Sequence, residues 1–128
     1  GEVAGFDLAA SNIQRGRDHA LPSYTAARKN FRLLVPRNFY ELGQVLQSPQ
    51  DARDVEKCYG RRSIHNLDAW PIALMEKKVP GSMVGPLFFS AIRDQFTRLR
   101  DGDRFHYLNL DFPCAVKSKY RRLKRVME

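Results

Sequence analysis

The chain has 128 residues, a size typical of a single domain, and 43% of them are hydrophobic, which is enough to form a buried core. No apolar run approaches the ~20 residues of a membrane-spanning helix, and no charged-then-apolar signal peptide is present. The formal net charge is +8, but residues 115–128 supply +5 of it, so the excess belongs to the C-terminal residues and argues against a nucleic-acid-binding body.

The first half of the sequence predicts four helices separated by clear helix-breaking signals. We expect them at Phe6 to about Asp18, at Pro22 to about Phe31, at 39–47 and at 49–59. The expected caps and stops are Asp7 near the first helix start, Pro22 in the first turn of the second, Asn38 before the third, Ser48 and Pro49 at the fourth, and Gly60 after it.

The second half predicts a loop, two helices and a basic end. Residues 61–66 form the expected loop, residues 67–79 a short helical piece interrupted or begun near Pro71, and Pro80-Gly81 a break. The strongest helical pattern covers 84–100, where Leu87, Ala91, Ile92, Phe96 and Leu99 make one apolar stripe. Residues 115–128 are expected to form a basic helix. Because no alternating strand pattern or internal repeat is present, we predict a mainly α, multi-helical fold.

Two cysteines, Cys58 and Cys114, leave three arrangements open: one internal disulfide, bonds to parts of a longer chain, or free thiols. The pair is weak evidence for a secreted protein. No cysteine and histidine cluster has the spacing of zinc ligands, so we expect no structural zinc.

The first predicted helix carries an unusual polar face. Leu8, Asn12, Arg15 and His19 follow one another at three- and four-residue steps, which places them on one side of a helix. Burying such polar groups without partners costs on the order of 1–3 kcal/mol each. Two interpretations follow: a solvated face with His19 as a local cap, or a binding face where Arg15 pairs with a ligand carboxylate and Asn12 accepts a hydrogen bond from an imidazole.

Three blocks of the sequence resemble the animal-type haem peroxidases, the superfamily of myeloperoxidase, thyroid peroxidase and peroxinectin. The first is "DLAASNIQRGRDHALPSY", similar to the family motif D-L-A-x-x-N-I-Q-R-G-R-D-H-G-L-P-x-Y-N. The second and third, "LDAWPIALMEKKVPGSMVGPLFF" and "SAIRDQFTRLRDGDRFHY", are similar to I-D-L-W-x-G-G-L-x-E and to Q-F-x-R-L-R-D-G-D-R-F-W-Y with its preceding G-P. The blocks occur in the family's order and cover about Gly5 to Tyr107, so the resemblance is specific.

The resemblance implies a haem-supporting role for the polar face. The asparagine matching Asn12 hydrogen-bonds the ring N–H of the proximal histidine that ligates haem iron, and the arginine matching Arg15 lies near a haem propionate. Arg17, Asp18 and His19 belong to the same motif, and we expect them to fold the turn. The implied cofactor is haem b, with covalent attachment left open; a calcium ion is left open too, and its ligands would lie outside this segment.

The family's distal histidine, distal arginine and proximal histidine all lie upstream of the first block and have no counterpart here. His19, His65 and His106 match none of these positions, so we assign no catalytic residue and no metal ligand. The chain therefore resembles the C-terminal portion of a peroxidase domain, residues 1–114, followed by the basic helix at 115–128. Alone it lacks the groups for peroxide cleavage and is expected to be inactive.

The function implied is that of a haem peroxidase, which reduces hydrogen peroxide while oxidising an organic or halide donor. The expected partners are peroxide, an electron donor and the rest of the domain. The expected setting is extracellular, with a response to oxidative stress and no transmembrane segment. The alternatives are a non-catalytic, truncated peroxidase-like module, and less favoured, a fatty-acid dioxygenase of the cyclooxygenase branch or a basic nucleic-acid-binding helical domain.

Several positions depart from the family pattern. Ala20 stands where the family has glycine, which disfavours a left-handed backbone there. Thr25 replaces asparagine, Leu108 replaces glutamate, and residues 71–73 replace the family's two glycines in a way reminiscent of the cyclooxygenase branch. We expect Trp70, Phe88 and Phe89 to be core residues, and 98–105 to be a salt-bridged turn because its arginines would repel calcium.

Overall fold

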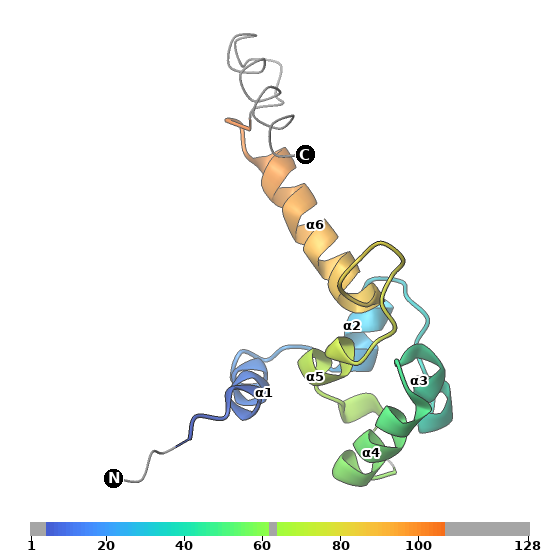
Figure 1. Cartoon of the computed structure of the whole chain (residues 1–128). Helices are drawn as coiled ribbons and strands as arrows, with labels where there is room; N and C mark the ends of the chain where they lie inside the picture. Colours follow the sequence, from blue (N-terminus) through green and yellow to red (C-terminus); the bar gives the residue numbers. More distant parts are fainter. Residues whose placement is uncertain (1–4, 62–63, 107–128) are drawn as a thin grey trace. The chain divides into compact units, whose positions relative to one another are not determined.

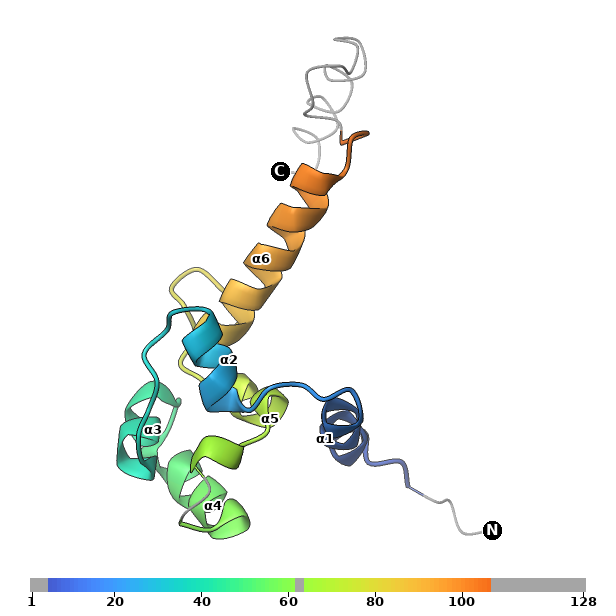
Figure 2. The same ribbon diagram turned by 180° about the vertical axis from the view of Figure 1, so that it is seen from behind.

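The computed structural model describes residues 5–61 and 64–106 and divides into two units, Gly1–Ala91 and Ile92–Glu128. Its elements are α1 (Leu8–Asp18), α2 (Tyr24–Asn30), α3 (Phe39–Val45), α4 (Pro49–Tyr59), a 3-10 turn (Ile64–Asn66), α5 (Ala69–Leu74) and α6 (Pro86–Gly102) (Figures 1 and 2). The unit boundary falls inside α6. The described residues contain no strand, only two isolated antiparallel bridges, Ser23 with Asp68 and Leu46 with Glu76. The predicted mainly α class is confirmed.

Helix starts follow the predicted caps in most places. The side chains of Asp7, Asn38 and Ser48 accept hydrogen bonds from backbone N–H groups of α1, α3 and α4, and Ser48 forms a capping box with Asp51. Gly60 ends α4 with a φ of 82°, as expected for a glycine stop. These caps were predictable because each one is built from residues two or three positions apart.

The start of the second helix was predicted wrongly. Pro22 was expected in the first turn, but Ser23 is the N-cap and α2 begins at Tyr24, which leaves Pro22 outside the helix. The Ser23 hydroxyl accepts a hydrogen bond from the Ala26 N–H at 3.4 Å. The Tyr24 N–H is satisfied by the Leu67 carbonyl at 2.8 Å, so the chain entering α2 is tied to the segment before α5.

The core of the first unit is formed by α2 to α5 and the start of α6. Helices α3 and α4 lie side by side, and α2 contacts both α5 and the 3-10 turn (Figures 1 and 2). The buried apolar side chains come from all of these elements: Tyr24, Ala27, Phe39, Leu42, Leu46, Ala52, Val55, Ile64, Leu67, Ile72, Ala73 and Leu87. In contrast, α1 has no buried residue.

The apolar stripe predicted on α6 is buried only at its start. Leu87 is buried, and Phe88 packs against the core, whereas Ile92, Phe96 and Leu99 are 49%, 67% and 55% exposed. Among the expected core aromatics, Phe89 is 40% exposed and Trp70 is half-buried. Residues 98–105 include the expected ion pairing, with Arg100 Nε donating to Asp101 Oδ1 at 2.7 Å, although the helix continues through Gly102.

Within the described ranges, no helix is both long and apolar enough to cross a membrane. The predicted basic helix at 115–128, the domain boundary after residue 114, and Cys114 lie outside the described residues. Cys58 is exposed in α4 and forms no disulfide with another described residue.

Candidate functional site

The polar face of α1 borders a hollow of about 260 Å³. The hollow is lined by Asn12, Arg15, Gly16, His19, Leu21 and Trp70. Asn12, Arg15 and His19 thus lie along one side of α1, and the approach of α5 adds Trp70 to that side. The periodicity placed the first three residues together, but it gave no sign that Trp70 would face them.

Asn12 and Arg15 are available for an additional partner. Among residues 5–61 and 64–106, neither side chain has a hydrogen bond or an ion pair. Asn12 is half-buried and Arg15 is exposed. An amide carbonyl that can accept and a guanidinium that can bind a carboxylate in a bidentate manner therefore border the same hollow. Leu21 and the Trp70 ring give it an apolar wall.

The end of α1 is closed by a Schellman motif that shapes this hollow. The Ala20 N–H donates to the Arg17 carbonyl at 3.1 Å, and the Leu21 N–H donates to the Gly16 carbonyl at 2.9 Å. This arrangement requires a left-handed residue after the cap, and Ala20 takes that conformation with a φ of 52°. Alanine is disfavoured in this conformation, as expected, but the two hydrogen bonds outweigh a strain of about 1–2 kcal/mol, so the backbone is left-handed all the same.

Arg17 joins α1 to the start of α5. Its Nε donates to Asp68 Oδ1 at 3.0 Å and its Nη2 to Asp68 Oδ2 at 2.7 Å, a bidentate pair. The Tyr59 hydroxyl, from the end of α4, donates to the same Asp68 Oδ2 at 2.6 Å. Arg17 was expected to fold the turn, but it instead connects elements 51 positions apart.

The electrostatics of this junction match its geometry. Hydrogen bonding from Arg17 lowers the pKa of Asp68 below its ordinary value, with Tyr59 acting in the same direction. Burial and the hydrogen bond to Asp68 raise the pKa of Tyr59. The Asp68 carboxylate is therefore ionised, and the Tyr59 hydroxyl stays protonated, over the ordinary pH range. Asp68 is also the N-cap of α5 but makes no capping hydrogen bond with its side chain.

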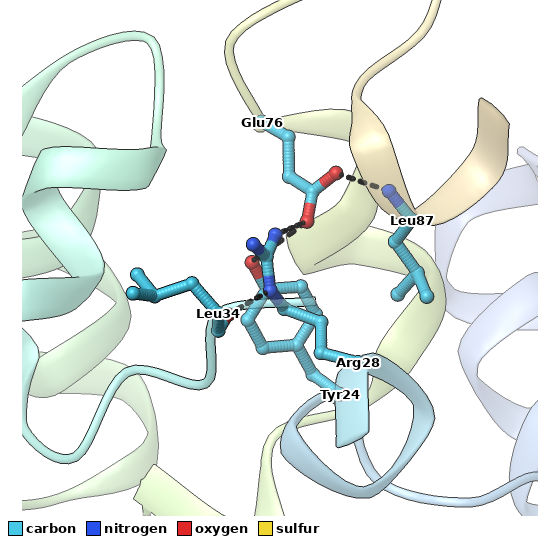
Figure 3. Close-up of polar contacts among 5 residues, drawn as sticks. All are labelled: Tyr24, Arg28, Leu34, Glu76 and Leu87. Atoms are coloured by element: carbon cyan, nitrogen blue, oxygen red, sulfur yellow. Dashed lines mark hydrogen bonds and ion pairs between the residues drawn. The ribbon is translucent and has the colours of Figure 1, made fainter. Parts of the chain in front are cut away.

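A second polar cluster lies in the core, away from the hollow (Figure 3). Arg28 pairs with Glu76, and the two side chains are 4% and 0% exposed. The Tyr24 hydroxyl donates to Glu76 Oε1 at 2.8 Å, and the Leu87 N–H donates to Glu76 Oε2 at 2.8 Å. Arg28 Nε also donates to the Leu34 carbonyl at 2.6 Å. Through these bonds the cluster connects α2, the segment that follows α5 and the start of α6.

Burial and the neighbouring Glu76 charge raise the pKa of Tyr24. Tyr24 is therefore a protonated donor at all ordinary pH values, which suits its hydrogen bond to the Glu76 carboxylate. Glu76 also places a negative charge at the N-terminus of α6, where the helix dipole favours it. These groups stabilise the fold, and no fully buried side-chain nitrogen or oxygen among the described residues lacks a hydrogen-bond partner.

The residues of the junction and of the core cluster lie in or near the motif blocks, but the sequence analysis gave most of them no role. Tyr24 and Arg17 lie in the first motif block, and Asp68, Glu76 and Gly85 lie in the second. A Cβ on Gly85 would stand 2.3 Å from the Glu76 Cβ, so this glycine is required by close approach. Arg28 follows Tyr24 by four positions on the buried face of α2, which is the pattern of a paired core charge.

No group of three or more histidine, cysteine, aspartate or glutamate side chains in the described part of the chain has the geometry of a metal site. His19 is exposed beside the hollow, and His65 is exposed in the 3-10 turn. The hollow offers a hydrogen-bond acceptor, the Asn12 carbonyl, and a cation, the Arg15 guanidinium. These two groups fit the surroundings of haem. The carbonyl can accept a hydrogen bond from the N–H of a ligating imidazole, and the guanidinium can pair with a propionate.

A family model and two curated relatives all match this chain as a peroxidase sequence. The family model described as animal haem peroxidase matches residues 1–125. Peroxidasin homolog pxn-2 of Caenorhabditis elegans is 42% identical over 125 residues, which is 98% of this chain and 9% of that protein. Eosinophil peroxidase of Mus musculus is 46% identical over 122 residues, which is 95% of this chain and 16% of that protein.

A solved structure shows the same helical arrangement. Peroxidase A from Dictyostelium discoideum matches with a TM-score of 0.76 and 30% identity, over 91% of this chain and 22% of that one. The chain spans less than a quarter of each of these proteins. The match covers nearly all of the sequence, including the three motif blocks, and the chain belongs to the animal haem peroxidase family.

Proposed function

We propose that this chain is the part of a haem peroxidase that supports the proximal side of haem b. In the full-length protein, Asn12 accepts a hydrogen bond from the ring N–H of the proximal histidine, and Arg15 pairs with a haem propionate. The observation that carries the proposal is that Asn12 and Arg15 border one hollow and have no partner among the described residues. Family membership and the peroxidase names of the relatives support it.

The contribution of each residue follows from its chemistry. A carbonyl that accepts from a ligating imidazole fixes the ring's orientation and raises its basicity, and Asn12 supplies such a carbonyl from the middle of α1. The Arg15 guanidinium stays charged at all ordinary pH values, and its fork of N–H groups fits a carboxylate. Trp70 and Leu21 add apolar surface to the same hollow.

When bound, haem supplies the redox chemistry by which peroxide is reduced and an organic or halide donor is oxidised. The residues of this chain hold the haem propionate and orient the proximal imidazole. Movement of the peroxide proton requires a distal base, and none is assigned among the described residues. This base belongs to another part of the full-length protein. An extracellular setting is part of the same proposal, consistent with relatives named peroxidasin and eosinophil peroxidase.

The test uses the full-length protein that carries residues 1–128, with Asn12→Ala and Arg15→Gln as the variants. Haem content per chain and the rate of peroxide turnover are measured together. We expect Asn12→Ala to lower haem retention or turnover by about 10- to 100-fold, the usual effect of losing a partner of a metal ligand. Arg15→Gln should weaken haem retention because the propionate loses its cation.

Gln14→Ala and Arg53→Gln are the matched controls, since both residues are exposed and neither lines the hollow. Both controls should keep wild-type haem content. Wild-type haem content and turnover in Asn12→Ala would refute the role assigned to it. A full-length wild-type protein that binds no haem would instead favour a non-catalytic peroxidase-like module.

A further inference from the structure

Helix α1 is held in place with little apolar burial. None of its residues is buried, and Leu8 and the following Leu21 are 62% and 59% exposed. An amphipathic helix usually docks through a continuous buried stripe. Among the described residues, the contact of α1 with α5 therefore depends in part on polar interactions.

The junction of Arg17, Asp68 and Tyr59 provides such an interaction. A bidentate guanidinium–carboxylate pair fixes the plane of both groups as well as their separation, so it restricts rotation more than a single hydrogen bond does. The Asp68 side chain is 17% exposed, and its Oδ2 also accepts a hydrogen bond from the Tyr59 hydroxyl at 2.6 Å. Arg17 is thus paired with a carboxylate that α4 and α5 already fix.

The position of Arg17 on α1 lets this junction set the direction of the polar face. At about 100° per residue, Arg17 projects roughly opposite to Arg15 and about 140° from Asn12. It follows Asn12 by five residues, about 7.5 Å along the helix axis. Fixing Arg17 on the α5 side therefore fixes the rotation of α1, and with it the direction in which Asn12 and Arg15 point.

The use of Asp68 is also unusual for its position. An aspartate at an N-cap normally accepts a hydrogen bond from the first helical turn, but Asp68 makes no such bond. Both of its carboxylate oxygens are used by Arg17 and Tyr59 instead. The carboxylate thus connects α4, α5 and α1 and does not cap α5.

We propose that Asp68 is a positioning residue for the haem-supporting face, acting through Arg17 to hold α1 in the rotation that presents Asn12 and Arg15. This inference rests on the proposed function, since it concerns the same face. Asp68 acts through Arg17 and does no chemistry in this role. Tyr59 restrains the Asp68 carboxylate, and its removal should have a smaller effect than removal of the charge.

The test compares Asp68→Asn and Tyr59→Phe in the full-length protein with Asp54→Asn as the control. Asp54 is an exposed α4 aspartate that pairs with Lys57, so its change removes an equivalent charge away from α1. Two quantities are measured: hydrogen exchange of peptides covering 8–18 and 39–46, and haem content per chain. The first needs no haem and reports on α1 and on the core separately.

We expect Asp68→Asn to speed exchange in 8–18 by about tenfold or more, to leave 39–46 as in wild type, and to lower haem content in the same direction as Asn12→Ala. Tyr59→Phe should have an intermediate effect, and Asp54→Asn should have none. Unchanged exchange in 8–18 would overturn the inference. Equal acceleration in 39–46 would also overturn it, because the role of Asp68 would then be general stability.

Failure of the proposed function gives a different pattern. In that case Asn12→Ala keeps wild-type haem content, and the haem-supporting roles of Asn12 and Asp68 are both refuted. Loss of haem in Asn12→Ala with unchanged 8–18 exchange in Asp68→Asn would leave the proposed function intact and remove only the positioning role.

Discussion

Helix α1 and the α2–α5 core are stabilised in different ways. Among the described residues, the core buries twelve apolar side chains, one of them Leu87 of α6, around the Arg28–Glu76 pair. Helix α1 buries no residue and is connected through the exposed Arg17 to Asp68. Among the described residues, α1 is therefore held by a few directional polar contacts, whereas the core is held by apolar burial and by the Arg28–Glu76 pair. Changes in the two regions should have effects of different size and extent.

The largest effect is expected from Glu76→Ala. Removing one partner of a buried ion pair leaves Arg28 charged and unpaired and also removes acceptors from Tyr24 and the Leu87 N–H. We expect a loss of roughly 3–5 kcal/mol in the free energy of unfolding. Urea unfolding would measure it, with the more exposed Glu56→Ala as the control. A loss below about 1 kcal/mol would show that the cluster is not central to the core.

The next effect in size is expected from Gly85→Ala. The added methyl group would stand 2.3 Å from the Glu76 Cβ, which lies next to the backbone and cannot swing away. We expect a destabilisation of about 1–3 kcal/mol, as for other overpacked sites. Gly102→Ala is the matched control, because a Cβ there meets nothing within 4 Å. Equal unfolding midpoints for the two variants would contradict the close approach of Gly85 to Glu76.

A smaller and opposite effect is expected from Ala20→Gly. The left-handed conformation at φ 52° costs alanine about 1–2 kcal/mol, and glycine relieves it while losing part of the gain through a more flexible unfolded state. We expect a net gain below about 1 kcal/mol, seen as slower hydrogen exchange across 8–18. Faster exchange in that peptide would mean that the Schellman motif does not limit the stability of α1.

The smallest effect on the whole molecule is expected from acid. Because the pKa of Asp68 is lower in the folded chain than in the unfolded one, its stabilisation is present above the ordinary carboxyl range and is lost as pH falls through the folded value. The junction should therefore open at acidic pH, with faster exchange in 8–18 before the core unfolds. Asp68→Asn should remove this pH dependence, and an identical acid response in that variant would assign it to another group.

The local features of the fold were predictable from the sequence, and the long-range ones were not. Asp7, Asn38, Ser48 and Gly60 were identified correctly as caps and a stop because each acts within its own helix end. Arg28 and Glu76 are 48 positions apart, and no periodic pattern indicates such a pairing. Pro22 was misplaced because Ser23, a better cap, takes the start of α2.

The candidate site shows the same division. Helical spacing placed Asn12, Arg15 and His19 on one face, and the structure agrees. The approach of Trp70 and the pairing of Arg17 with Asp68 depend on how α1 meets α5, which is set by tertiary contacts. Trp70, Arg17 and Asp68 all lie in the motif blocks. Membership in a motif, however, did not distinguish a side chain that positions a helix from one that folds a turn.

The most direct test of the account is the stretching frequency between iron and the proximal imidazole in the ferrous full-length protein, compared between wild type and Asn12→Ala. If Asn12 accepts the imidazole N–H, its removal makes the ring less basic and weakens its bond to iron, so the frequency should fall. Gln14→Ala should leave it unchanged. An identical frequency in wild type and Asn12→Ala would contradict the claim that α1 presents Asn12 to the proximal ligand.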